Sequence, residues 1–360
     1  MTSAAVVRLR LFNQQLVDSS CLTPLDVVRR LGAVQAQDYA AAKWALALRA
    51  RGLSEADIDA AFDSGTIVRT HVLRPTWHFV APADLRWLLE LTAPRIRAAA
   101  ARSYRRLALE PAVLAKSRRT IARALAHGQY LTRTELGGVL RRAGVAVDGL
   151  RRAFVTIDAE IEGVMCSGPR RNGQFTYALL DERVPAGRRF SRDEALCRLA
   201  RTYFGSHGPA TLIDFAWWSG LAARDARSAI DAVGPGLEQE TVGGRTYCFV
   251  AARPPALRRA PTVHLLPNFD EYLVAYQHRE PITRAARSRV ALSRGDLLTN
   301  CVVVDGIVVG TWKRTIGSGG ATVEITLTER VSPRVRRALR AAADAYGDFL
   351  HRPIECSVRR

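Results

Sequence analysis

One order of secondary structure occurs three times along the 360 residues of this chain, and this repetition is the strongest constraint on its fold. Each occurrence has three segments with apolar residues at helical spacing, followed by two runs of β-type residues. The predicted helices and strands are residues 23–31, 40–50, 54–64, 67–72 and 76–80 in the first occurrence, 114–127, 132–143, 150–162, 164–167 and 175–180 in the second, and 192–204, 211–219, 222–233, 237–242 and 246–251 in the third. Helices that precede a β-hairpin are the order of a winged helix, so we expect three winged-helix units that share a pattern and little residue identity.

Local signals mark the boundaries of several predicted elements. Thr23 is a suitable N-cap, Pro24 fits the first helical position after it, and Gly32 ends that helix. In the second unit we expect the hairpin tip at residues 168–173. In the third unit the glycine pair at 243–244 forms the hairpin turn.

The segments outside the three units complete the predicted architecture. A packing helix at 4–17 precedes the first unit, and an arginine-rich helix at 82–108 connects it to the second. Near the C-terminus we predict strands at 262–266, 300–304, 307–313 and 322–328, and a closing helix at 333–350. The expected fold class is α+β, mainly α, with three tandem winged-helix units and a C-terminal β-rich subdomain. The predicted domains are residues 1–108, 109–190, 191–256 and 257–360.

Composition excludes several classes of protein. No segment approaches the roughly 18 consecutive apolar residues of a membrane span, and the first residues lack the basic start and apolar stretch of a signal peptide. We therefore expect a cytoplasmic protein with no membrane partner. The six cysteines are far apart, and none forms a C-x-x-C pair or a cluster with histidine. We expect buried thiols, no metal site and no cofactor.

The formal net charge of +19 predicts attraction to a polyanion. Of the 53 basic residues only Lys43, Lys116 and Lys313 are lysines, so 53 − 3 = 50 are arginines. A GC-rich genome accounts for part of that bias, but the planar arginine fork also suits phosphate. We expect a monomer that binds double-stranded DNA, with the three units forming a DNA-binding cradle around one duplex.

A short polar interruption at residues 34–38 (VQAQD) lies between two apolar helical stretches and is the candidate for chemistry. If this segment is extended, Ala36 turns inward and the side chains of Gln35 and Gln37 share one face and point into one cleft. The alternative is that both glutamines only satisfy backbone groups in a helix-to-helix connection. Spacing alone does not decide between these readings.

Three stretches together resemble the AlkZ-type bacterial DNA glycosylases of the winged-helix superfamily. They are the Gln-Ala-Gln segment, residues 69–78 (RTHVLRPTWH) and residues 267–276 (PNFDEYLVAY), and their order and spacing match over nearly the whole chain. Two positions depart from the family pattern, because Pro75 stands where relatives often have glycine and His278 where an acidic residue is expected. Neither departure touches the glutamine pair.

The resemblance implies a monofunctional DNA glycosylase that hydrolyses the N-glycosidic bond of N7-alkylated purines, including bulky adducts and interstrand crosslinks. Gln35 and Gln37 match the family's glutamine–apolar–glutamine motif and would be catalytic. The reaction would serve DNA repair or self-resistance to a DNA-alkylating antibiotic. The main alternative is a winged-helix transcription regulator without catalysis, and a third possibility is a non-catalytic architectural protein.

The chemistry of the motif fits a cationic substrate. Glycoside hydrolysis usually needs an acid for the leaving group and a carboxylate for the water, whereas this motif supplies amides. Amides suffice when the base already carries positive charge, because its departure then yields a neutral base. Asp38 is the rival for water activation, and its other role would be N-cap of the helix at 40–50.

The remaining site predictions concern DNA contact. The expected contacts are His71, Arg74, His78, Arg170, Arg171, Lys313 and Arg314. The two histidines would bond phosphate or fill a hairpin pair. The acidic pair Asp270 and Glu271 is expected to neutralise neighbouring arginines. The hairpin turns at 317–320 and 305–306 are both candidates for reaching a crosslinked base, which cannot leave the duplex completely.

Overall fold

The computed structural model describes residues 1–252, 260–283 and 299–360. The boundary between residues 256 and 257 that we predicted for the last two domains therefore lies outside the described residues. The architecture is α+β and mainly helical, with four small sheets in the described chain, as the sequence predicted. None of the described helices is long and apolar enough to cross a bilayer.

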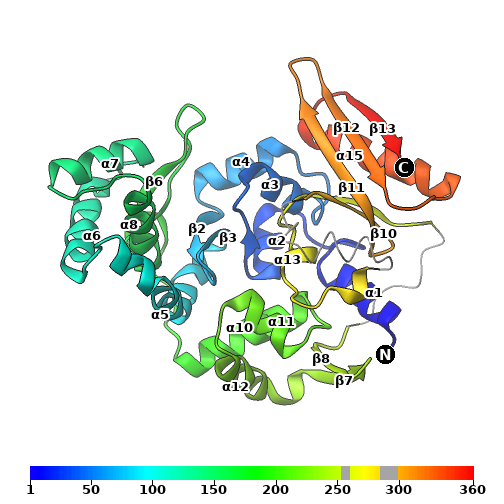
Figure 1. Cartoon of the computed structure of the whole chain (residues 1–360), viewed down its shortest axis with the longest axis horizontal. Helices are drawn as coiled ribbons and strands as arrows, with labels where there is room; N and C mark the ends of the chain where they lie inside the picture. The colour runs from blue at the N-terminus through cyan, green and yellow to red at the C-terminus, as the bar shows by residue number, and fades with distance from the viewer. Residues whose placement is uncertain (253–259, 284–298) are drawn as a thin grey trace.

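The first unit follows α1 (Ser3–Asn13) and forms the centre of the molecule (Figure 1). Its elements are α2 (Pro24–Leu31), β1 (Val34–Gln35), α3 (Tyr39–Ala47), α4 (Glu55–Ser64), β2 (Val68–Val72) and β3 (Thr76–Val80). The helix α2 begins as predicted, because the Thr23 side chain accepts from the backbone N–H of Asp26 and Pro24 occupies the first turn. The strand β1 pairs with β3, so the sheet order is β1-β3-β2.

The second unit has the same topology as the first. The helix α5 (Pro82–Arg106) leads into α6 (Pro111–Leu125), β4 (Leu131–Thr132), α7 (Arg133–Arg142), α8 (Leu150–Ile161), β5 (Met165–Ser167) and β6 (Thr176–Leu179). Its sheet order β4-β6-β5 again places the short strand beside the last one. The hairpin tip lies at residues 171–174, which overlap the predicted range 168–173 and extend one residue beyond it.

The third unit repeats the order with a single bridge in place of the short strand. After α9 (Leu180–Arg183) it has α10 (Arg192–Ser206), α11 (Leu212–Ser219), α12 (Ala223–Val233), the 3-10 turn η1 (Gly234–Gly236), β7 (Glu238–Val242) and β8 (Arg245–Phe249). Ala210 pairs with Cys248 on β8. The first two units share the order helix–strand–helix–helix–hairpin, and the third has an isolated bridge at the position of the short strand; that these units are winged helices stays a prediction.

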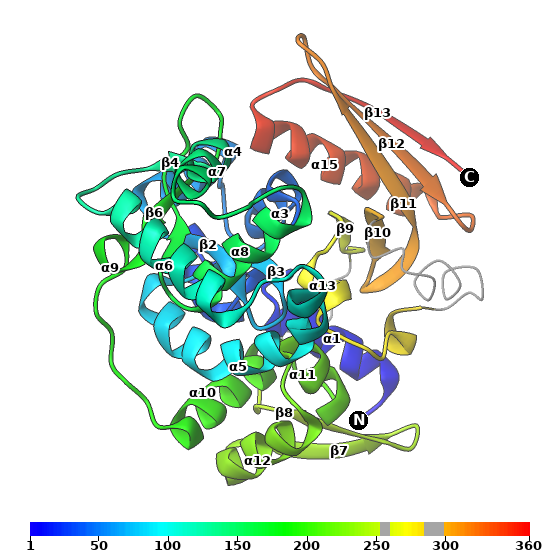
Figure 2. The ribbon, with the colours of Figure 1, turned by 60° about the vertical axis from the view of Figure 1, so that its left-hand side comes forward.

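The C-terminal subdomain is a five-stranded sheet covered by one helix. Its elements are β9 (Val263–Leu266), α13 (Glu271–Val274), η2 (Glu280–Ile282), β10 (Cys301–Val304), β11 (Ile307–Ile316), β12 (Ala321–Leu327), α15 (Pro333–Leu350) and β13 (Ile354–Arg359). The sheet order is β13-β12-β11-β10-β9, and only the β12–β13 pair is parallel. Figure 2 shows α15 lying along this sheet. The sequence did not predict β13, α13 or the two-residue strand β4, and it indicated β1 only as an extended segment without a partner strand.

The first unit packs against all three other parts. One hydrophobic core joins its helices to the C-terminal sheet and α15, for example Trp44 against Tyr346 and Phe349. A second core joins its hairpin β2–β3 and α5 to the helices of the third unit. The second unit is joined by polar contacts such as the hydrogen bond from the backbone N–H of Arg69 to Ser167 Oγ, at 2.9 Å. The Gln-Ala-Gln segment therefore lies where the parts meet.

Candidate active site

The Gln-Ala-Gln segment begins as the edge strand of the first sheet. Gln35 lies opposite His78, and the backbone N–H of Ala36 donates to Trp77 O at 2.7 Å. Ala36 is fully buried, as extended alternation predicted. Because Ala36 and Trp77 form the hydrogen-bonded pair, the N–H of Gln35 points away from β3, toward the open edge of the sheet.

Two charged side chains hold the backbone of this segment. On one side Arg69 Nε donates to Ala36 O at 2.9 Å and Nη2 to Gln37 O at 3.5 Å, and its guanidinium lies 4.3 Å from the Trp77 ring centroid. On the other side Glu271 Oε1 accepts from the N–H of Gln35 at 2.7 Å. Sequence reasoning assigned neither role, because each depends on residues that are distant along the chain.

The two glutamine amides differ in exposure. Gln37 is exposed, and its Oε1 accepts from the backbone N–H of Trp77 at 3.4 Å. A carbonyl oxygen has two lone pairs, so one remains free to accept from water. Gln35 is only 7% exposed, and its amide forms no hydrogen bond within the described chain. Gln35 is thus less accessible than the sequence suggested.

Asp38 has the structural role that the sequence predicted. Its Oδ1 accepts from the backbone N–H of Ala41 at 3.1 Å and caps α3. Its Oδ2 accepts from Asn268 Nδ2 at 3.2 Å, in the third resembling stretch. Both carboxylate oxygens therefore have partners, and the structure brings the first and third of the resembling stretches together at this residue.

The acidic pair at 270–271 divides into two roles. Asp270 forms a buried ion pair with Arg49, as predicted for a carboxylate that neutralises arginine. Glu271 forms no direct ion pair with arginine or lysine within the described chain, but its charge acts against burial to raise the pKa of Arg49 and Arg74. Its partners are the N–H of Gln35, Trp218 Nε1 at 3.0 Å and His207 at 3.5 Å. Burial is the largest influence and acts to raise the pKa of Glu271, but the neighbouring His207 and His78 and the Gln35 N–H together outweigh it, so the pKa lies below its usual value.

The two histidines on the first hairpin are buried, which corrects the expectation that they lie on its DNA-facing surface. His71 bonds Glu160 of the second unit and packs on Trp77, its cross-strand neighbour, with ring centroids 4.5 Å apart. His78 has no exposed surface, and burial lowers its pKa to about 4. Of the two readings of His71, filling a hairpin pair is the one that this geometry fits. Neither histidine offers an exposed ring for a contact with DNA.

The predicted basic contacts fall into two groups. Arg170 and Arg171 are engaged with acidic residues, Arg170 with Asp59 and Asp63 of α4 and Arg171 with Glu135. Each would have to exchange that ion pair for a phosphate in order to contact DNA, so neither is free for such a contact in this structure. The other three are less constrained, and they are Arg74, Lys313 and Arg314.

Of this second group, Lys313 is exposed, and Arg74 is half-buried on the turn between β2 and β3. Two guanidinium nitrogens of Arg74 have no hydrogen-bond partner in the described chain. Its guanidinium lies 5.6 Å from the exposed Trp217 ring centroid. The half-buried Arg314 lies 5.9 Å from the ring centroid of Tyr346.

The two candidate hairpin turns have different environments. In the turn at 305–306 Gly306 is buried and its carbonyl oxygen accepts from Tyr272 Oη at 2.9 Å, whereas Asp305 is exposed. Gly306 has φ +79°, and a Cβ there would lie 2.2 Å from Val7. In contrast, residues 317–319 are exposed at the end of the long β11–β12 hairpin, which projects from the subdomain in Figures 1 and 2. The second turn is therefore the more exposed of the two.

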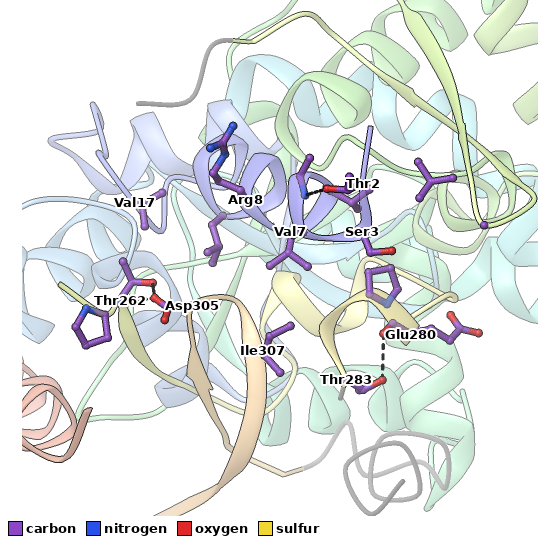
Figure 3. Close-up of a pocket in the computed structure, with 18 of the residues that line it drawn as sticks. Thr2, Ser3, Val7, Arg8, Val17, Thr262, Glu280, Thr283, Asp305 and Ile307 are labelled. Carbon is purple, nitrogen blue, oxygen red and sulfur yellow. Dashed lines mark hydrogen bonds between the residues drawn. The ribbon is translucent and has the colours of Figure 1, made fainter. Parts of the chain in front are cut away.

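A large open cavity of about 1060 Å³ lies elsewhere (Figure 3). Its walls come from the N-terminal turn of α1, the β7–β8 turn and the segment around Glu280, and neither glutamine lines it. Chain neighbours of its lining, at 253–259 and 284–298, lie outside the described residues, so we assign it no role. The described residues contain no group of three or more histidine, cysteine or carboxylate side chains that could hold a metal ion.

Comparisons with known proteins identify the chemistry. The family model "DNA glycosylase AlkZ-like" matches residues 28–349. A curated relative from Streptomyces sahachiroi, named "Interstrand DNA cross-link repair glycosylase", is 28% identical over 302 residues, which are 80% of this chain and 81% of that protein. The solved structure of "Streptomyces sahachiroi DNA glycosylase AlkZ" has the same fold, with a TM-score of 0.82 over 99% of this chain and 100% of that chain at 24% identity.

These comparisons show both the kind of enzyme that this protein is and the family to which it belongs. The protein is a DNA glycosylase, an enzyme that hydrolyses N-glycosyl bonds, and the alternative of a non-catalytic regulator is set aside. Because the family model covers most of the sequence, the chain belongs to the AlkZ-like DNA glycosylase family.

Proposed function

We propose that this enzyme releases N7-alkylated purines from duplex DNA, including bulky adducts and purines tied into interstrand crosslinks. It would act as a monofunctional glycosylase, in the cytoplasm, as a monomer and without a cofactor. Its biological task would be DNA repair or self-resistance to an alkylating antibiotic. The crosslink-repair name of the curated relative supports this substrate class.

The observation that carries the proposal is the placement of Gln35 and Gln37. Their backbone is held by Arg69 and Glu271, and the nearest carboxylate in sequence, Asp38, is engaged by Ala41 and Asn268. The site therefore offers two neutral amides for water and no free carboxylate on this segment. Such a site suits a substrate that needs no proton donor.

In the proposed reaction, water adds to C1′ of the nucleotide while the bond from C1′ to N9 of the purine breaks. The electron pair of that bond moves to N9 and neutralises the cationic base, so the base leaves as a neutral molecule. The water loses its proton to solvent. The Gln37 carbonyl, held by the N–H of Trp77, and the Gln35 amide orient this water by proximity.

We further propose that the β11–β12 tip at 317–320 reaches the lesion inside the duplex, with Lys313 and Arg314 on the same hairpin and Arg74 on the first hairpin contacting phosphate. A base crosslinked to the opposite strand cannot be extruded fully, so a projecting element is needed. The exposure of Lys313 supports its assignment, whereas the unpartnered nitrogens of Arg74 are buried, so Arg74 would reach phosphate only after its side chain turned outward.

The test uses two duplexes, one with a single N7-methylguanine and one with a defined N7-linked crosslink. Each is incubated with enzyme in EDTA without added metal, then treated with alkali, which cleaves at abasic sites. We expect strand cleavage at the lesion in both duplexes. Absence of cleavage in the first would overturn the substrate class, and absence in the second alone would remove crosslinks from it.

A further inference from the structure

Glu271 is a fully buried carboxylate between the first and third units. Its Oε1 accepts from the Gln35 N–H at 2.7 Å, and its Oε2 accepts from Trp218 Nε1 at 3.0 Å. His207 Nε2 lies 3.5 Å from the same Oε2. One side chain thus connects the backbone of a proposed catalytic residue to two side chains of the third unit.

Glu271 keeps its charge in this buried position without a direct arginine or lysine partner in the described chain. A buried ionised carboxylate is usually paired with arginine or lysine, as Asp270 is with Arg49. Within the described chain its hydrogen-bond donors are the Gln35 N–H and the Trp218 indole, His207 lies beside it, and Arg49 and Arg74 interact with its charge without pairing to it directly. Because one of these donors is the backbone of a proposed catalytic residue, a role in the reaction explains the position of the carboxylate.

The strand β1 needs support on its open edge. It has two residues and pairs only with β3, so the Gln35 N–H has no partner in the sheet. A carboxylate acceptor gives a short charge-assisted bond that fixes this peptide more firmly than a neutral acceptor does. The position of the Gln35 amide follows from the orientation of its own backbone.

We propose that Glu271 is a positioning residue for base release, which orients Gln35 through its backbone N–H and is itself fixed by Trp218 and His207. This inference rests on the proposed function, because it assumes that Gln35 takes part in the reaction. It adds that the third unit determines the geometry of a catalytic residue that belongs to the first.

The primary test is Glu271→Gln, which keeps the length of the side chain. The amide oxygen still accepts from Gln35, but its NH₂ group meets the Trp218 N–H, and two donors cannot bond each other. We expect a single-turnover rate of base release lower by about 10- to 100-fold, since small misplacements of reacting groups have effects of this size. DNA affinity should stay within about twofold of wild type.

The matched control is Tyr203→Phe. It removes another buried hydrogen bond onto the same segment, from Tyr203 Oη to Ala275 O at 2.9 Å, without touching Glu271. Both variants are assayed well below their melting temperatures, and the Gln35 amide proton is followed by NMR. We expect this proton to shift upfield only in Glu271→Gln, while Tyr203→Phe keeps the wild-type shift and rate.

A second variant keeps the test decisive if Glu271→Gln fails to fold. Trp218→Phe leaves the carboxylate and removes one of its donors, so we expect a smaller loss of rate, about threefold to tenfold, with unchanged affinity. Wild-type rates in both variants, with Gln35→Ala inactive, would overturn the inference and leave the proposed function standing. If Gln35→Ala also releases base at the wild-type rate, both fall.

Discussion

Arg49 and Asp270 form a two-point ion pair, with nitrogen–oxygen distances of 2.7 and 2.8 Å, in which neither side chain has exposed surface. Arg49 follows α3 of the first unit, and Asp270 precedes α13 of the C-terminal subdomain. The guanidinium also donates to Gln14 Oε1 and Ala45 O. The pair therefore joins two parts of the chain that lie far apart in sequence.

Asp270→Asn should destabilise the folded enzyme strongly, because it leaves the Arg49 charge buried without a counter-ion. We expect a loss of about 3–5 kcal/mol in the free energy of unfolding, measured by urea denaturation. The control is Asp225→Asn, which breaks the more exposed pair with Arg192 and should cost less than about 1 kcal/mol. Equal effects of the two substitutions would contradict this account of the buried pair.

Gln37→Ala and Gln35→Ala should each lower the rate of base release by about 10², toward the small end of acid–base contributions, because a neutral amide only orients water. DNA affinity should hardly change. The double variant should lose less than the product of the singles, since both amides hold one water. Gln37→Asp should retain part of the activity on cationic lesions, because a carboxylate can also orient water.

Asp38→Asn is the matched control for the glutamine variants. Asparagine is a good N-cap, so α3 should remain intact and base release should continue. If Asp38→Asn abolishes release with affinity intact while both glutamine variants work at the wild-type rate, Asp38 is the base and the amide mechanism is wrong.

Binding to undamaged duplex should depend steeply on salt, given the net charge of +19. If six or more phosphates are neutralised, the affinity should fall by about 10³ or more between 50 and 200 mM salt. Fluorescence anisotropy over a salt series measures the slope. Lys313→Ala should reduce the slope of log affinity against log salt concentration by the contribution of about one phosphate contact. An affinity that hardly responds to salt would contradict phosphate-dominated binding.

The free energy of unfolding should fall between about pH 6.5 and pH 4. Burial lowers the pKa of His78 and of His264 to about 4, so in this range the unfolded chain takes up protons that the folded protein does not. The contribution of each histidine to the free energy of unfolding is fully present above pH 6.5 and is lost as the pH falls toward 4. Each contributes about 2.5 kcal/mol to the loss between pH 7 and pH 4.5.

His264 lies on β9, away from the glutamine pair, and is suited to test this linkage. In His264→Leu the loss of stability between pH 7 and pH 4.5, followed by urea unfolding, should be smaller by about 2.5 kcal/mol. The control is His351→Asn. His351 is exposed and has a left-handed backbone conformation, which asparagine tolerates, so this variant should keep the wild-type pH dependence.

Local sequence signals predicted the elements that local chemistry determines. The helix α15 has the predicted bounds, because Pro333 fits the first turn and the apolar stripe that includes Leu339 and Ala343 recurs at helical spacing. Asp38 was also correctly expected to cap α3, because capping depends on residues that are neighbours in sequence. In contrast, β1 has two residues and no detectable period, and it exists because β3 and Glu271 satisfy its backbone groups.

The candidate site was predictable only in part. The glutamine pair stood out as a polar interruption between helical stretches, and its catalytic role came from a resemblance. The contact of Glu271 with Gln35 could not be predicted, because the two residues are 236 positions apart. The burial of His71 likewise depends on Glu160 of the second unit. Hydrophobic spacing reports which face of an element is buried, but it carries no information on which distant polar group that face meets.

The 236-residue separation between Gln35 and Glu271 also bears on how the enzyme is made. When the N-terminal unit leaves the ribosome, neither Glu271 nor the strands and α15 that complete its core have been synthesised. The glutamine pair therefore reaches its final geometry only after most of the chain has been translated. A chain that stops before residue 271 lacks the acceptor of the Gln35 N–H and the strands and helix that complete the core of the first unit.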